Sequence, residues 1–103
     1  MVRLLIVEDE KKLRVLMSDF FKMKGYEVSE AENGIDATKI LQQQEFDMIF
    51  LDIMMPGMDG IEVCRKVRTQ TDVPILFLTA LYDEETKLKG YASGADDFVT
   101  KPF

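Results

Sequence analysis

Residues 47–60 read DMIFLDIMMPGMDG, and this segment gives the clearest indication of the fold class. Its first part, residues 47–51, is the most continuously apolar strand candidate in the chain, and the carboxylate of Asp52 follows directly. A short apolar run of this kind is typical of a buried strand in a parallel sheet. The dipeptides Pro56-Gly57 and Asp59-Gly60 then predict a loop before the next helix. The stretch therefore predicts a central strand that carries Asp52 to one edge of a sheet.

The other apolar runs also end at polar side chains, namely Glu8 with Asp9, Thr79 and Lys101. In an open parallel sheet the carboxyl ends of the strands share one edge, and ligands bind at that edge. The sequence therefore predicts a single site that gathers three carboxylates, a hydroxyl and an ammonium.

Strand and helix signals alternate along the whole chain. The expected strands are residues 2–7, 26–31, 47–51, 74–78 and 98–100. The expected helices are residues 10–23, a second that begins at Asn33-Gly34, a third after Gly60, and residues 83–92. This alternation indicates right-handed crossovers and a doubly wound parallel α/β sheet.

Two of these helices have apolar residues at helical spacing that we expect to face the core. In residues 10–23 they are Leu13, Leu16, Met17, Phe20 and Phe21. In residues 83–92 the stripe is thin and consists of Leu88, Tyr91 and Ala92.

Composition narrows the class of protein. A chain of 103 residues with 47% hydrophobic and 31% charged residues fits one soluble domain, and no apolar run approaches the roughly 20 residues of a membrane span. The single cysteine, Cys64, excludes an intrachain disulfide and fits a reducing cytoplasm. The net charge of −6 argues against nucleic-acid binding by this chain alone. The absence of histidine excludes catalysis by a histidine base.

The predicted site contains an electrostatic conflict. Two like charges about 4 Å apart repel by about 4 kcal/mol at an effective dielectric of about 20. Three carboxylates and one lysine therefore favour recruitment of a hard cation, Mg²⁺ or Mn²⁺, which prefers oxygen ligands. Asp52 is then a candidate nucleophile, because a carboxylate can accept a phosphoryl group as an acyl phosphate.

Four motifs together resemble those of bacterial response-regulator receiver domains. They are IVED at 6–9, LDIMMPGMDG at 51–60, LTA at 78–80 and GADDFVTKPF at 94–103. The resemblance covers the chain in order and implies a five-stranded flavodoxin-like sheet with strand order 2-1-3-4-5. The ending resembles most closely the winged-helix transcription factors of that family.

The resemblance also implies roles for individual residues. Asp52 is the expected phosphoacceptor, with Thr79 and Lys101 contacting the phosphoryl group. Glu8, Asp9, Asp52 and the backbone carbonyl of Met54 are the expected Mg²⁺ ligands. Phe98 occupies the position of an aromatic switch residue that moves together with Thr79. A sensor histidine kinase is the expected phosphodonor partner. The receiver itself is expected in the cytoplasm, without membrane contact.

Other interpretations stay open at this point. An aspartyl phosphohydrolase shares the layout, although Met54 stands where such enzymes usually carry a second acid. A receiver that binds metal without being phosphorylated is another alternative. Taken singly, Asp9 could merely cap a helix, and Asp96-Asp97 could be a solvated loop.

The chain is expected to be a receiver domain over residues 1–103 that lacks the family's final helix and any output domain. DNA binding is then expected only through an output domain. Without the final helix, one face of the sheet should expose apolar side chains, which predicts self-association.

Overall fold

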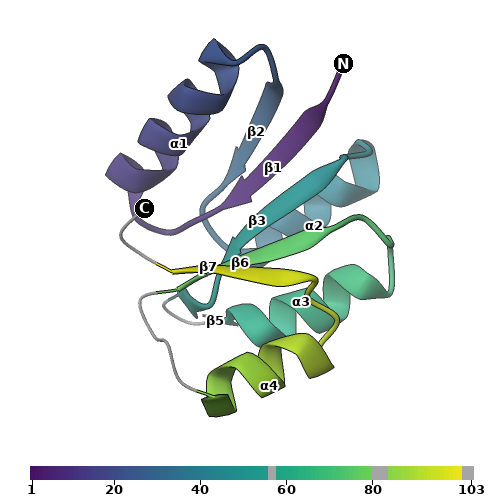
Figure 1. The fold of residues 1–103 in the computed structure, drawn as a ribbon. Helices are drawn as coiled ribbons and strands as arrows, with labels where there is room; N and C mark the ends of the chain where they lie inside the picture. The colour runs from purple at the N-terminus through teal and green to yellow at the C-terminus, as the bar shows by residue number, and fades with distance from the viewer. Residues whose placement is uncertain (56–57, 80–83, 101–103) are drawn as a thin grey trace.

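The computed structural model describes residues 1–55, 58–79 and 84–100 (Figure 1). The main sheet has the order β2-β1-β3-β6-β7, and all of its neighbouring strands are parallel. Its strands are β1 (Arg3–Val7), β2 (Glu27–Ala31), β3 (Met48–Asp52), β6 (Ile75–Thr79) and β7 (Asp97–Thr100). Counted along these five strands, the order is 2-1-3-4-5, so the predicted fold class is confirmed.

The helices are α1 (Lys11–Met23), α2 (Gly34–Gln43), α3 (Gly60–Arg68) and α4 (Glu84–Ala92). Asn33 begins α2 as expected, since its side-chain oxygen accepts a hydrogen bond from the backbone N–H of Asp36 at 2.8 Å. The alternative in which Asp9 caps α1 is wrong, because Glu10 occupies the N-cap position.

A small antiparallel pair of strands lies within the predicted loop after β3. Its strands are β4 (Met54–Met55) and β5 (Met58–Asp59), and they pair antiparallel. Two-residue strands carry no periodic signal, so the sequence pattern could not reveal this pairing.

The sheet is the middle layer of three, with α1 on one face and α2, α3 and α4 on the other (Figure 1). Alternate strand residues feed the two layers, because side chains of a strand point to opposite faces in turn. On the α1 face the buried apolar cluster is Leu4, Ile6, Met17, Phe50 and Leu78. On the opposite face the most deeply buried residues are Leu5, Ala37, Ile49, Leu51, Cys64, Ile75 and Phe77.

The apolar side chains of α1 are less buried than their helical spacing predicts. Met17 is buried, but Leu16 and Phe20 are 67% and 54% exposed, which corrects the expectation that all five apolar residues of this helix face the core. Beside them an apolar groove of about 380 Å³ opens between the helix and the sheet. Its lining residues are Leu16, Met17, Phe20, Phe21, Phe50, Leu78 and Val99.

The predicted apolar stripe of α4 is also wrong. Leu88 and Tyr91 are 67% and 44% exposed, whereas Gly90 is buried. A β-carbon on Gly90 would lie 2.3 Å from the ring of Phe98 and 3.2 Å from that of Phe77. The helix therefore meets the sheet through its glycine, because only a residue without a side chain lets the two rings approach.

Among the described residues, no helix combines the length and the apolar composition that a membrane crossing requires.

Candidate functional site

The sheet register brings two of the predicted carboxylates to neighbouring positions. Val7 of β1 lies beside Leu51 of β3, so Glu8 and Asp52 follow at the same level of the sheet edge. One carboxylate oxygen from each of Glu8, Asp9 and Asp52 lies within 4.8 Å of the other two. The structure thus brings together the three acidic residues that the strand ends predicted.

Burial makes this cluster electrostatically demanding. The exposed fractions of Glu8 and Asp52 are 1% and 3%, while Asp9 is exposed. Repulsion between carboxylates grows as water is excluded, because the effective dielectric falls. Two buried acids and one exposed acid, with oxygens that converge, form a donor set that suits a hard divalent cation open to water on one side.

Glu8 is fixed through its backbone and its side chain. Its N–H donates to the carbonyl oxygen of Ala31 at 3.1 Å, which extends the pairing of β1 with β2 by one residue. Its carboxylate accepts from the N–H of Glu10 at 3.3 Å, and its carbonyl accepts from Nη1 of Arg14 at 2.8 Å. The acidic turn after β1 is therefore held at several points.

Asp52 is positioned by close backbone contacts. A β-carbon on Gly60 would lie 2.3 Å from the carbonyl oxygen of Asp52, so α3 begins directly against the phosphoacceptor candidate. The N–H of Gly60 donates to the carbonyl of Ile53 at 2.9 Å, and the N–H of Ile53 donates to Leu78 at 3.2 Å. Asp59 caps α3 by accepting from the N–H of Ile61 at 2.8 Å.

The remaining predicted site residues are described only in part. Thr79 ends β6 and lies beside Thr100 of β7, which puts its backbone at the same sheet edge. Met54 is the first residue of β4, two positions after Asp52, and the role of its carbonyl stays a prediction. Lys101 lies outside the described residues, so its expected role is untested.

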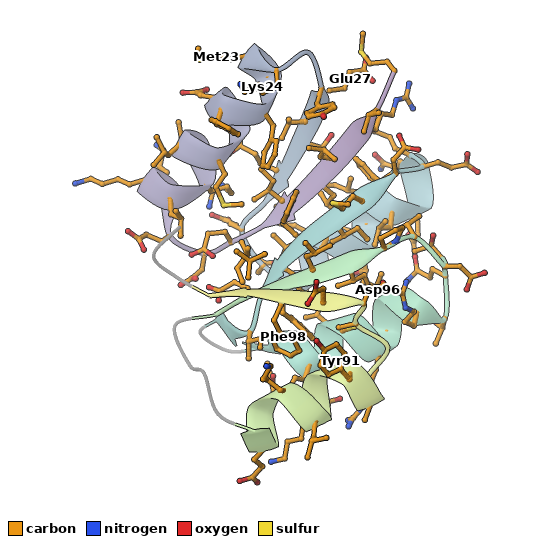
Figure 2. All side chains as sticks on the ribbon, in the orientation of Figure 1. Met23, Lys24, Glu27, Tyr91, Asp96 and Phe98 are labelled. Carbon is orange, nitrogen blue, oxygen red and sulfur yellow. The ribbon has the colours of Figure 1, made fainter. Side chains whose placement is uncertain are left out.

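Phe98 occupies an aromatic cluster between β7 and α4, as Figure 2 shows. Its ring centroid lies 5.4 Å from that of Phe77 and 5.1 Å from that of Tyr91, in an edge-on arrangement with the tyrosine. The side chain is half-buried. Its role as a switch stays a prediction.

Sequence reasoning misread Asp96, which is not simply a solvated loop residue. Its Oδ2 accepts from the N–H of Ile75 at 2.8 Å and from Nη2 of Arg68 at 2.5 Å. The same arginine donates from Nε to the carbonyl of Gly94 at 2.7 Å. These bonds tie the start of β6 to the turn before β7 and to the end of α3. Asp96 therefore holds these segments together at the end of β6 that is opposite Thr79.

Residues 4–103 match the family described as the response regulator receiver domain. The chain belongs to this family. It is 42% identical over 101 residues to the transcriptional regulatory protein ResD of Bacillus subtilis, and these residues are 98% of this chain and 42% of that relative. The receiver therefore spans well under half the length of this regulator.

Solved receiver structures share the fold throughout. The chemotaxis protein CheY4 of Vibrio cholerae is 38% identical, with a TM-score of 0.97 over 100% of this chain and 88% of that one. The response regulator TrrA of Thermotoga maritima, crystallised in complex with Mg²⁺ and BeF, is also 38% identical. Its TM-score is 0.88 over 100% of this receiver and 89% of that chain.

Proposed function

We propose that this receiver accepts a phosphoryl group on Asp52 from the phosphohistidine of a sensor histidine kinase and thereby switches an output. The observation that carries the proposal is the convergence of Glu8, Asp9 and Asp52 within 4.8 Å, with Asp52 buried at the carboxyl end of the central strand. Three carboxylates this close to one another repel, and a bound cation would offset that repulsion.

The transfer is a displacement at phosphorus. An oxygen of the Asp52 carboxylate forms the new P–O bond as the P–N bond to the donor imidazole breaks, and the electron pair of that bond leaves with the nitrogen. Catalysis of such a step rests mainly on positioning and on stabilising charge at the phosphoryl oxygens. Lys101 and Thr79 are the groups that we assign to those oxygens. The domain thus promotes its own phosphorylation and dephosphorylation.

Mg²⁺, or Mn²⁺ in its place, would be held by Glu8, Asp9, Asp52 and the carbonyl of Met54. Such a cation supplies positive charge that offsets both the carboxylates and the phosphoryl oxygens. Support comes from the oxygen-only donor set of this chain and from TrrA, whose structure holds Mg²⁺ with BeF.

The output that we propose is transcription, through a DNA-binding domain outside residues 1–103. ResD is a transcriptional regulator of which this receiver covers 42%, and that supports the proposal. The acidic charge of −6 fits a receiver that leaves DNA contacts to another domain. Cys64 is buried and forms no disulfide, which fits a protein of the reducing cytoplasm.

Phe98 is the residue that we assign to the switch. Its half-buried ring fills the space above Gly90, against Phe77 and Tyr91. Rearrangement of Thr79 on phosphorylation would change what this ring packs against, and α4 would transmit the change.

The apolar groove beside α1 supports self-association as a further property. Leu16 and Phe20 are exposed at its rim, and apolar surface of this kind favours association.

Incubation with acetyl phosphate and Mg²⁺, followed by intact mass spectrometry and a free-phosphate assay, tests the proposal. A receiver yields one phosphoryl adduct per chain that decays slowly and forms again when donor is added. Sustained phosphate release without an adduct would favour the phosphohydrolase instead. Neither adduct nor release would favour a receiver that binds metal alone.

A further inference from the structure

We propose that Arg14 is a positioning residue for the metal site, which it serves by fixing the turn that carries Glu8 and Asp9. The inference rests on the proposed function, since it concerns how that site is held ready for Mg²⁺. Arg14 belongs to α1 and is not itself one of the proposed metal ligands.

The guanidinium of Arg14 joins two strand ends. Nη1 donates to the carbonyl oxygen of Glu8 at 2.8 Å, and Nε donates to Oε1 of Glu30 at 3.2 Å. Glu30 precedes Ala31, whose carbonyl accepts the N–H of Glu8 at 3.1 Å. One planar group therefore connects the end of β1, the end of β2 and the first turns of α1.

The carbonyl that Arg14 holds belongs to the peptide between Glu8 and Asp9. Rotation of that peptide would redirect both flanking side chains, so a donor on its oxygen fixes the direction from which two carboxylates approach a cation. The side chain of Arg14 is only 13% exposed and that of Glu30 is 31% exposed, so neither is an ordinary surface charge. A planar guanidinium can serve both acceptors at once, whereas an ammonium is a point charge without that geometry.

An electrostatic role and a positioning role for Arg14 predict opposite changes in Mg²⁺ affinity when the residue is removed. A positive charge near the site repels a divalent cation, so removal of a purely electrostatic Arg14 should tighten Mg²⁺ binding. Removal of a positioning Arg14 should weaken it, because the carboxylates lose their fixed approach. If Arg14 only stabilises the fold, its removal should leave the Mg²⁺ affinity of the folded protein unchanged.

The test measures Mg²⁺ affinity by calorimetric titration of the unphosphorylated protein, alongside urea unfolding without Mg²⁺. Its variants are Arg14→Met, Arg14→Lys and the control Arg65→Met, which removes an exposed arginine that pairs with Glu62 on α3. We expect Arg14→Met to weaken Mg²⁺ binding about tenfold, the lower end of the range for partners that orient metal ligands. Arg14→Lys should weaken it less, and Arg65→Met should leave it unchanged.

Each outcome decides the inference. Wild-type affinity or tighter binding in Arg14→Met overturns it while leaving the metal site intact, and unfolding data show whether that variant is folded. If Arg14→Met does not fold, Arg14→Lys decides, since wild-type affinity in that variant overturns the inference. A wild-type protein that binds no Mg²⁺ overturns the proposed metal site and this inference together.

Discussion

Gly60 lies so close to Asp52 that a β-carbon at Gly60 would sit 2.3 Å from the carbonyl oxygen of Asp52 and 2.6 Å from Cα of Ile53. Both obstructing atoms belong to the backbone, so neither can swing aside as a side chain would. The start of α3 and the end of β3 can therefore approach this closely only with glycine at position 60.

Gly60→Ala should both destabilise the protein and slow phosphorylation. The added methyl group must push α3 away from Asp52, and overpacking of this kind costs about 1–3 kcal/mol. Urea unfolding measures the stability, and the rate of acetyl phosphate labelling measures the effect on the site.

Gly25→Ala is the matched control for this substitution. Gly25 has a φ of 94° and no atom within 4 Å of its virtual β-carbon, so alanine there strains the backbone without a clash. That strain costs about 1–2 kcal/mol. It arises at the turn before β2, away from the site. If both variants label at the wild-type rate, the contact between Gly60 and Asp52 does not position the phosphoacceptor.

Arg68→Met should lower the free energy of unfolding by about 1–3 kcal/mol, because it removes the guanidinium that donates to two carbonyls and to a carboxylate. These acceptors are the carbonyls of Gly94 and Val73 and the carboxylate of Asp96. Arg65→Met, which breaks only an exposed pair with Glu62, should change stability by no more than about 0.5 kcal/mol. Equal effects of the two substitutions in chemical denaturation would contradict the structural role of Arg68.

Cys64 gives a pH-dependent prediction. Burial raises the pKa of its thiol above the ordinary 9.0, with a smaller opposing effect from a hydrogen bond with the side chain of Ser93. The folded state thus disfavours the thiolate, so the associated stability is complete below pH 9.0 and is lost as pH rises towards the folded pKa.

The comparison of wild type with Cys64→Ala isolates this effect from other groups that titrate at high pH. We expect the variant to lose less stability than the wild type between pH 8 and 10 (about one pH unit either side of the ordinary pKa). Alkylation of the native wild-type thiol should also be slow compared with the urea-unfolded chain. If the stability curves of wild type and Cys64→Ala run parallel with pH, and the native thiol is alkylated rapidly, the thiol is not buried.

The sequence predicts those features of this molecule that follow from a local pattern or from a general rule of parallel sheets. The carboxylates of Glu8 and Asp52 could be predicted to meet, because each directly follows an apolar strand and parallel strands share an edge. Asn33 could be recognised as a cap for a different reason, since capping depends only on the next few residues.

The features that sequence reasoning missed depend on contacts between distant segments. Asp96 bonds to Ile75 and Arg68, which are 21 and 28 positions away. Helical spacing shows that Leu16 and Phe20 align with Met17, but it cannot show whether a neighbouring element covers them. In α4 the close approach of Gly90 to Phe98 overrides the apolar stripe, and a glycine gives no hydrophobic signal.

The exposed rim of the groove beside α1 should promote self-association. Substitution of both Leu16 and Phe20 by Gln should reduce the association constant seen by sedimentation, since it removes the largest exposed apolar side chains beside the groove. Ile35→Gln on α2, where the residue is 58% exposed, is the control for general surface polarity. Monomeric wild-type protein at all concentrations would contradict this prediction.

Peptide mapping of the acetyl phosphate adduct shows whether Asp52 is the residue that is phosphorylated. The adduct is trapped by borohydride reduction and located in wild type, Asp52→Asn and the control Asp72→Asn, which changes an exposed acid outside the cluster. We expect one adduct on Asp52 in wild type and in Asp72→Asn, its loss on removal of Mg²⁺, and no adduct in Asp52→Asn. Undiminished labelling of Asp52→Asn, or an adduct on another residue in the wild type, would contradict the assignment of Asp52 as the phosphoacceptor.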